Sequence, residues 1–120
     1  AWNGSSESAR AAFDALPFLK AAKEVTLLVV DAETNVGQDD VFSGTAIAGA
    51  LARHGVKITI QNQRSGDVSV ADIIQNHVAD AGTDLLITGA YSQSRLKEFF
   101  FGGVTRSLMQ SMTCATFMSR

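Results

Sequence analysis

The fold is decided by the stretch Asp84-Leu-Leu-Ile-Thr-Gly89-Ala-Tyr-Ser92, followed after nine residues by Gly102-Gly103-Val104-Thr105. Its first half is a short apolar run that ends at a glycine, which is typical of a buried strand. Its second half predicts a helix that begins at the glycine pair. Amides at a helix start favour an anion, commonly phosphate, and glycines let backbone approach it. The residues also leave open that these glycines merely permit tight turns.

Apolar periodicity on both sides of this stretch predicts alternating strands and helices. Strands are expected at Val25–Val30, Val56–Ile60, Leu85–Thr88 and Thr113–Met118, and Ala1–Asn3 resembles the last residues of another strand. Helices are expected from Ser5 to about Ala22 with a kink or break at Pro17, over Val41–His54, from Ser69 to Ala81, and from Gly102 to about Ser111. Gly55 and Gly82 are natural residues just past two of these helices.

Two strands differ in character. The continuous apolar run Val25–Val30 is typical of a strand buried on both faces. In Val56–Ile60, apolar and polar residues alternate, which predicts an exposed strand towards a sheet edge, and Gln61–Asp67 is expected to be a turn. The alternation predicts one α/β domain over residues 1–120, a parallel sheet with helices on both faces. Ligands of such sheets bind outside the carboxyl ends of the strands.

The composition argues against several functional classes. A formal net charge of −2 with 18% charged residues gives no basic stripe for nucleic acid or for an anionic membrane surface. No apolar run approaches the roughly 20 residues of a membrane span, so a soluble, cytoplasmic location is expected. The single cysteine, Cys114, rules out an internal disulfide framework. His54 and His77 lack partners at metal-ligand spacing, and no nucleophile–base arrangement is visible.

The run from Asp84 to Thr105 resembles the signature stretch of the universal stress protein family. The ending Ala115–Ser119 and the opening Ala1–Ser5 are also similar to that family, most of all to the C-terminal domain of tandem members. The resemblance implies a five-stranded parallel sheet of order 3-2-1-4-5, an adenine nucleotide alpha hydrolase-like fold, and a role in stress response. In that order the first strand is central, yet only Ala1–Asn3 of it is present. We therefore expect more polypeptide before Ala1, or a strand of another chain in the gap.

The resemblance also implies a site for ATP or a related adenine nucleotide, with Mg²⁺ accompanying it. Asn3 stands where an aspartate contacts the nucleoside, and Val30 matches a residue that lines the adenine pocket. Ser92 stands where a second glycine is expected, and Gly103 where a hydroxyl residue is expected. The implied binding residues are Asn3, Val30, Gly89, Ser92, Gly102, Gly103, Val104 and Thr105.

Departures from the family pattern bear on binding. A serine at position 92 costs roughly 1 kcal/mol relative to glycine if its φ is positive. Gly103 loses a hydroxyl and keeps its amide, and Asn3 keeps an acceptor without the charge. Two functions follow: a regulatory nucleotide-binding module, with at most weak ATP hydrolysis, or a dimerising scaffold without nucleotide. In either case the resemblance implies pairing through Ala115–Met118, with a second copy or a second such domain.

Overall fold

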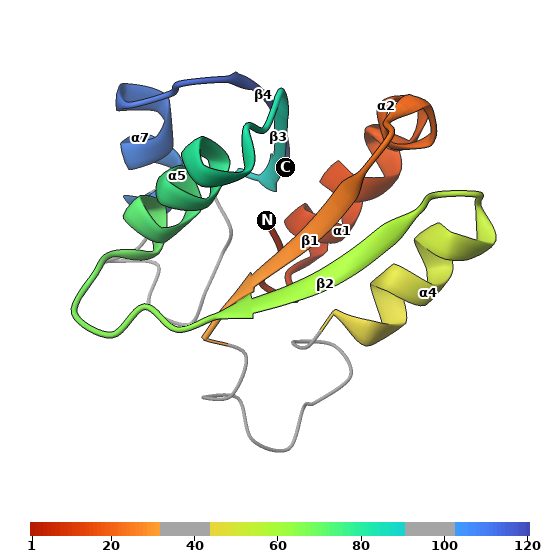
Figure 1. Ribbon diagram of the computed structural model, residues 1–120, viewed down its shortest axis with the longest axis horizontal. Coiled ribbons are helices and arrows are strands. Elements are labelled where there is room, and N and C mark those ends of the chain that lie inside the picture. The colour runs from red at the N-terminus through yellow and green to blue at the C-terminus, as the bar shows by residue number, and fades with distance from the viewer. Residues whose placement is uncertain (32–43, 91–102) are drawn as a thin grey trace.

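The computed structural model describes residues 1–31, 44–90 and 103–120. Helices and strands alternate over most of this length (Figure 1). In chain order they are α1 (Ser6–Asp14), α2 (Leu16–Ala21), β1 (Val25–Val30), α4 (Thr45–Arg53), β2 (Ile58–Gln63), α5 (Val70–Ala81), β3 (Leu85–Gly89), α7 (Gly103–Gln110) and β4 (Ala115–Ser119).

The strands form two parallel pairs. β1 pairs with β2 from Val25 opposite Ile58 to Val30 opposite Gln63. β3 pairs with β4 from Leu85 opposite Ala115 to Gly89 opposite Ser119. The expectation of one continuous five-stranded sheet is therefore not met by the described residues, which make two sheets of two strands each.

The N-terminal residues lie between the two pairs. Trp2 forms a parallel bridge with Val29, and its N–H donates to the Leu28 carbonyl at 2.9 Å. On the other side, the α-amino group of Ala1 donates to the Ile87 carbonyl at 2.6 Å. Two residues cannot pair along strands of five or six residues, because each residue spans only about 3.3 Å of a strand. This explains why the two sheets stay separate, and we call residues 1–3 the seam segment.

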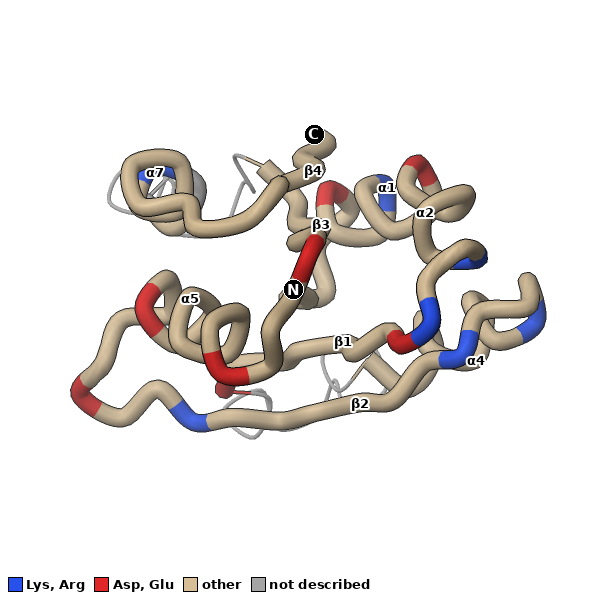
Figure 2. Tube along the Cα trace, turned by 45° about the horizontal axis from the view of Figure 1, so that its top comes forward, with Lys and Arg blue, Asp and Glu red and all other residues tan. Residues whose placement is uncertain are grey.

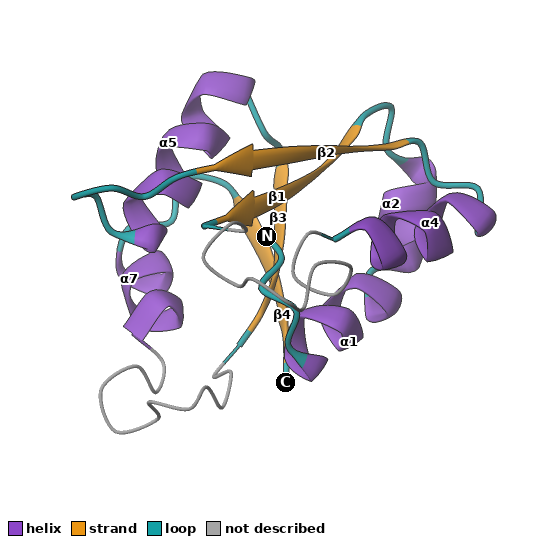
Figure 3. Cartoon of the chain, turned by 90° about the horizontal axis from the view of Figure 1, so that it is seen from below, coloured by secondary structure: helices purple, strands orange, loops and turns teal. Residues whose placement is uncertain are grey.

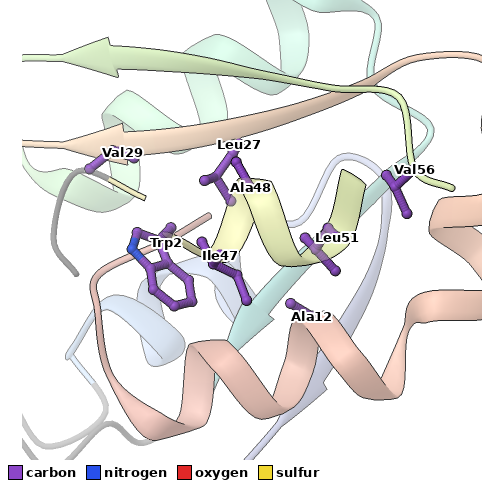
Figure 4. Packing of buried hydrophobic residues seen from close by; sticks show 8 residues of the cluster. All are labelled: Trp2, Ala12, Leu27, Val29, Ile47, Ala48, Leu51 and Val56. Carbon is purple, nitrogen blue, oxygen red and sulfur yellow. The ribbon is translucent and has the colours of Figure 1, made fainter. Parts of the chain in front are cut away.

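Helices cover the strands from two sides. α1, α2 and α4 lie on one side, and α5 and α7 lie on the other (Figure 3). Each side has its own apolar core. The α1–α4 cluster comprises Trp2, Ala12, Leu27, Val29, Ile47, Ala48, Leu51 and Val56 (Figure 4). The α5–α7 cluster comprises Leu28, Ala71, Ile74, Val78 and Leu108.

Strand β1 contributes to both clusters. Leu27 and Val29 point into the α1–α4 cluster, whereas Leu28 joins the α5–α7 cluster. Successive side chains of a strand face opposite sides, so a strand between two helical layers needs apolar residues at every position. The prediction that this strand is buried on both faces is confirmed.

Glycine and proline set the helix boundaries. The helix expected from Ser5 to Ala22 is broken at Ala15, and Pro17 lies in the first turn of α2, so the predicted break is confirmed. The helix expected over Val41–His54 begins only at Thr45, because Gly44 has a φ of 80°. A Cβ on Gly44 would come within 2.5 Å of Leu27 Cδ2, so only glycine fits this approach. Residues 41–43 of that prediction lie outside the described part.

The predicted strand Val56–Ile60 is shifted towards the C-terminus. β2 runs from Ile58 to Gln63, so the turn expected from Gln61 begins too early. Val56 precedes the strand and is buried in the α1–α4 cluster, while the residues from Thr59 to Asn62 are exposed. Within the described chain β2 pairs with β1 alone, which agrees with a strand at a sheet edge.

Candidate functional site

Three of the predicted binding residues end parallel segments at one edge. Val30 is the last residue of β1, Gly89 the last of β3, and Asn3 ends the seam segment between them. The seam segment runs parallel to β1, with Trp2 beside Val29, and Ala1 bonds to Ile87 of β3. Asn3, Val30 and Gly89 therefore lie at the carboxyl edge of the strands. This is the edge at which α/β proteins bind ligands.

Asn3 organises the start of α1. Its side chain is exposed, and its Oδ1 accepts the N–H of Ser5 at 3.0 Å. Ser5 is the N-cap, and its Oγ accepts the Ser8 N–H at 3.1 Å. Gly4 turns the chain between them with a φ of 77°. The amide group of Asn3 still carries a second oxygen lone pair and two N–H donors for a ligand.

Gly89 is held against the first turn of α1. A Cβ at this position would lie 2.6 Å from the backbone nitrogen of Ser8 and 2.7 Å from the backbone carbon of Glu7. Real Cβ atoms do not approach backbone this closely, so the glycine is required by the packing of α1 on β3.

Beyond Val30 the chain turns sharply at Asp31. Asp31 has a φ of 58°, the only positive value at a non-glycine residue within the described ranges. Its N–H donates to the Gln63 carbonyl at 2.8 Å. Its carboxylate accepts the Ser65 N–H at 2.9 Å and the Ser65 hydroxyl at 2.6 Å. These bonds lower the pKa of the Asp31 carboxyl below 3.8, with a smaller contribution from the charge of Arg64.

The remaining predicted residues belong to α7. Gly103 is the first residue of α7, Val104 is 38% exposed, and Thr105 lies in the same helix. α7 lies on the face opposite α1 (Figure 3), and Val30 packs against the α5–α7 cluster on that same face. The predictions for Ser92 and Gly102 fall outside the described residues.

Asp31 and Ser65 were not predicted as site residues. From sequence they look like parts of two polar loops, 34 positions apart. An aspartate directly after a buried strand was the available signal, because Asp tolerates positive φ better than most residues. Its partner could not be found without the pairing of β1 with β2.

The described basic residues are spread over the chain. Lys and Arg residues lie around α2, α4 and the starts of β1 and β2 (Figure 2), while Arg64 and Arg120 directly follow β2 and β4.

Other kinds of site find no support in residues 1–31, 44–90 and 103–120. No three His, Cys, Asp or Glu side chains there come together to hold a metal ion. A hollow between α5, α7 and the β3–β4 pair, bordered by Leu86, Leu108 and Cys114, offers about 10 Å³, which is room for one water molecule. None of the helices described is long and apolar enough to cross a membrane.

Parallel strands covered by helices on both sides define an α/β protein. The model of the universal stress protein family matches residues 1–120, so the chain belongs to this family. Among curated proteins no relative matches the sequence.

Two solved structures share the fold. One is hypothetical protein MJ0577, a structural-genomics test case for assigning biochemical function from structure, with 21% identity and a TM-score of 0.66 over 96% of this chain and 90% of that one. The other is the universal stress protein UspA from Lactobacillus plantarum, with 14% identity and a TM-score of 0.62 over 99% and 93% of the two chains. At these identities the likeness concerns the fold alone.

Proposed function

We propose that this domain binds ATP or another adenine nucleotide in a regulatory role within a stress response. The observation that carries the proposal is the meeting of Asn3, Val30 and Gly89 at the carboxyl edge of parallel strands, beside the start of α1. Membership of the universal stress protein family supports the same assignment. The chemistry needs no catalytic residue, and ATP hydrolysis would be weak at most.

In this proposal the two residue groups hold different ends of the nucleotide. Asn3 and Val30 take the nucleoside, because the exposed amide can bond a ribose hydroxyl and the valine offers an apolar surface. The phosphates, with any Mg²⁺, go to Ser92, Gly102, Gly103, Val104 and Thr105, where α7 begins. Gly89 ends β3 at the same edge, where its lack of a side chain lets α1 approach.

The proposal is tested by titrating a labelled ATP analogue into the protein. We expect Asn3→Ala to weaken binding by about tenfold, the effect of one lost hydrogen bond to a ligand. Asn76→Ala, on the exposed surface of α5, is the matched control and should bind like the parent. Ser92→Gly should tighten binding if the serine strains the loop. Absence of binding at millimolar nucleotide would contradict the proposal.

A scaffold role is the second candidate, favoured by the aromatic surface beside β4. Phe18 of α2 is 55% exposed and meets Phe117 of β4 with ring centroids 6.1 Å apart. β4 pairs only with β3 within the described chain. We propose that Ala115–Met118 pairs with a second copy, or with a second domain of the same type. Phe117→Lys should then shift the protein to a smaller species in analytical ultracentrifugation and leave ATP binding unchanged.

The arrangement of the whole domain is also proposed here. We infer that β2, β1, the seam segment, β3 and β4 stand in the order 3-2-1-4-5, with the seam segment in the middle position. The hydrogen bonds of Trp2 to β1 and of Ala1 to β3 support this order. A domain of this kind, most similar to the C-terminal half of a tandem protein, would act in the cytoplasm.

A further inference from the structure

A hydrogen-bonded link joins the end of β1 to the loop after β2. Ser65 donates to Asp31 twice, from its N–H at 2.9 Å and from its hydroxyl at 2.6 Å. Asp31 in turn donates its N–H to the Gln63 carbonyl at 2.8 Å. The Gln63 side-chain nitrogen lies 3.4 Å from Nδ1 of His77, which extends the link to α5.

The link stabilises a backbone conformation that Asp31 would not hold by itself. A φ of 58° is uncommon for a residue with a Cβ, and such conformations persist only where the surroundings enforce them. The Gln63 carbonyl, the Ser65 N–H and the Ser65 hydroxyl all bond to Asp31, from the end of β2 and the loop that follows it. The direction in which the chain leaves Val30 is therefore set by Ser65.

We propose that Asp31 and Ser65 are positioning residues for the base end of the bound nucleotide. This inference rests on the proposed function, because Val30 is the residue assigned to the base. By fixing the turn directly after Val30, the link holds the backbone of Val30 in the orientation that a planar base requires. Neither Asp31 nor Ser65 needs to touch the ligand.

The charge of Asp31 explains why the link serves the base and not the phosphates. The carboxylate is ionised at neutral pH, and its hydrogen bonds from Ser65 lower its pKa further. A negative charge repels phosphate and is indifferent to a neutral base. In the proposed arrangement the phosphates lie at the start of α7, and Asp31, directly after Val30, belongs to the base end.

The test compares adenosine with ATP in the intact protein. Ser65→Ala removes the hydroxyl, and Asp31→Gly removes the carboxylate while accepting the positive φ. We expect each variant to bind both ligands about tenfold more weakly, with the same factor for adenosine as for ATP. The double variant should be no weaker than Asp31→Gly alone, since both lack the two bonds from Ser65 to the carboxylate. Ser65→Thr should restore binding, because it keeps the hydroxyl.

Asp14→Ala is the matched control. It removes another hydroxyl–carboxylate bond, from Ser119 at 2.8 Å, at the C-terminal end of α1. Its affinity for both ligands should equal that of the parent. The unfolding temperature of every variant is measured, so that an unfolded variant is not mistaken for a weak binder, and Asp31→Asn replaces Asp31→Gly if the latter does not fold.

Three results would overturn the inference. Parent-like binding by folded Ser65→Ala would do so while leaving the proposed function intact. A loss of ATP affinity without a loss of adenosine affinity would place the link at the phosphates instead. If the parent itself binds neither ligand, the proposed function fails first and the inference fails with it.

Discussion

Gly89 shows how one glycine can serve packing where a ligand was expected. A glycine at the end of a strand, followed later by the pair Gly102-Gly103 at a helix start, is consistent with a phosphate loop. The structure gives it another task, because the backbone of Glu7 and Ser8 occupies the place of its Cβ. The close contact of α1 with β3 thus requires a residue without a side chain at position 89, independently of any ligand.

Gly89→Ala should destabilise the protein by about 1–3 kcal/mol, the usual cost of adding atoms to a well-packed contact. Gly49→Ala is the control, since its Cβ in α4 would meet only Arg53 Nη1 at 3.7 Å. Because Gly49 lies within a helix, that change should stabilise by about 0.5–1 kcal/mol. Equal effects of the two changes in chemical denaturation would contradict the packing role.

Asp31 should make stability depend on acid pH. Its pKa is lowered from 3.8 in the folded state, so its bonds to Ser65 contribute fully above pH 3.8. The contribution is lost as the pH falls through the lower folded value, because the carboxylate must then be protonated. Unfolding curves of the parent and Asp31→Asn should therefore differ at neutral pH and converge below pH 3.8. A difference that stays constant across this range would contradict the assignment.

Sequence reasoning placed candidate residues only where local patterns mark the ends of secondary-structure elements. Val30 and Gly89 end recognisable strands, and Asn3 precedes a capped helix, so all three could be placed at one edge. The link between Asp31 and Ser65 could not be found, because it depends on which residue of β2 stands beside Val30. That register also depends on β2, whose start was predicted two residues and whose end three residues too early.

Among the secondary-structure elements, those with chemical stop signals were predicted best. α5 begins after Ser69 and ends before Gly82, which has a φ of 63°, as the capping residues indicate. β2 was placed two residues early, because Val56 looks like a strand residue but packs under α4 ahead of the strand. The start of helix α4 was predicted too early. No local signal in the sequence shows that Gly44 has a left-handed backbone conformation and lies close to Leu27.

The cap of α5 gives a prediction at the same scale. Ser69 Oγ accepts the Asp72 N–H at 3.1 Å, which satisfies one of the free donors at the helix start. Ser69→Ala should lower the free energy of unfolding by about 1 kcal/mol, and Ser69→Asp should recover most of it. Ser111→Ala, an exposed position after α7, should change little. Thermal denaturation of the three variants checks the order.

On the scale of the whole molecule, the weak place is the seam between the two strand pairs. The two apolar cores are joined by β1, and the seam segment is the only described backbone that bonds to both pairs. The amino group of Ala1 is buried there, and burial lowers its pKa from 8.0 to about 5. Burial thus disfavours the charged form of the amino group, whereas an uncharged peptide N–H could make the same hydrogen bond to the Ile87 carbonyl without this cost.

The 120-residue chain should therefore become more stable as the pH rises from 5 to 8. Between these values the unfolded chain binds a proton at Ala1 that the folded chain excludes, so stability increases with pH. The total gain is on the order of 2–4 kcal/mol, from the size of the shift. Acetylation of Ala1 should remove this dependence, and the difference between the two curves isolates the contribution of the amino group.

The same place should accept an extended strand. A segment of four Val or Ile residues fused before Ala1 should raise the unfolding temperature by on the order of 5 °C or more, because it pairs with the inner edges of β1 and β3. A Gly-Ser segment of equal length is the control, since it also moves the charge but has little tendency to form a strand. Equal unfolding temperatures for the two fusions would show that no strand position exists there.

The position of the indole ring gives the seam an optical signal. Trp2 is the one tryptophan of the chain, and it is 8% exposed among Leu27, Val29 and Gly44. Tryptophan fluorescence, excited selectively over that of Tyr91, therefore reports on this boundary. Release of the seam segment would move the emission to longer wavelength while the circular dichroism of the helices persists. Opening between the strand pairs can thus be followed separately from global unfolding, without attaching a dye.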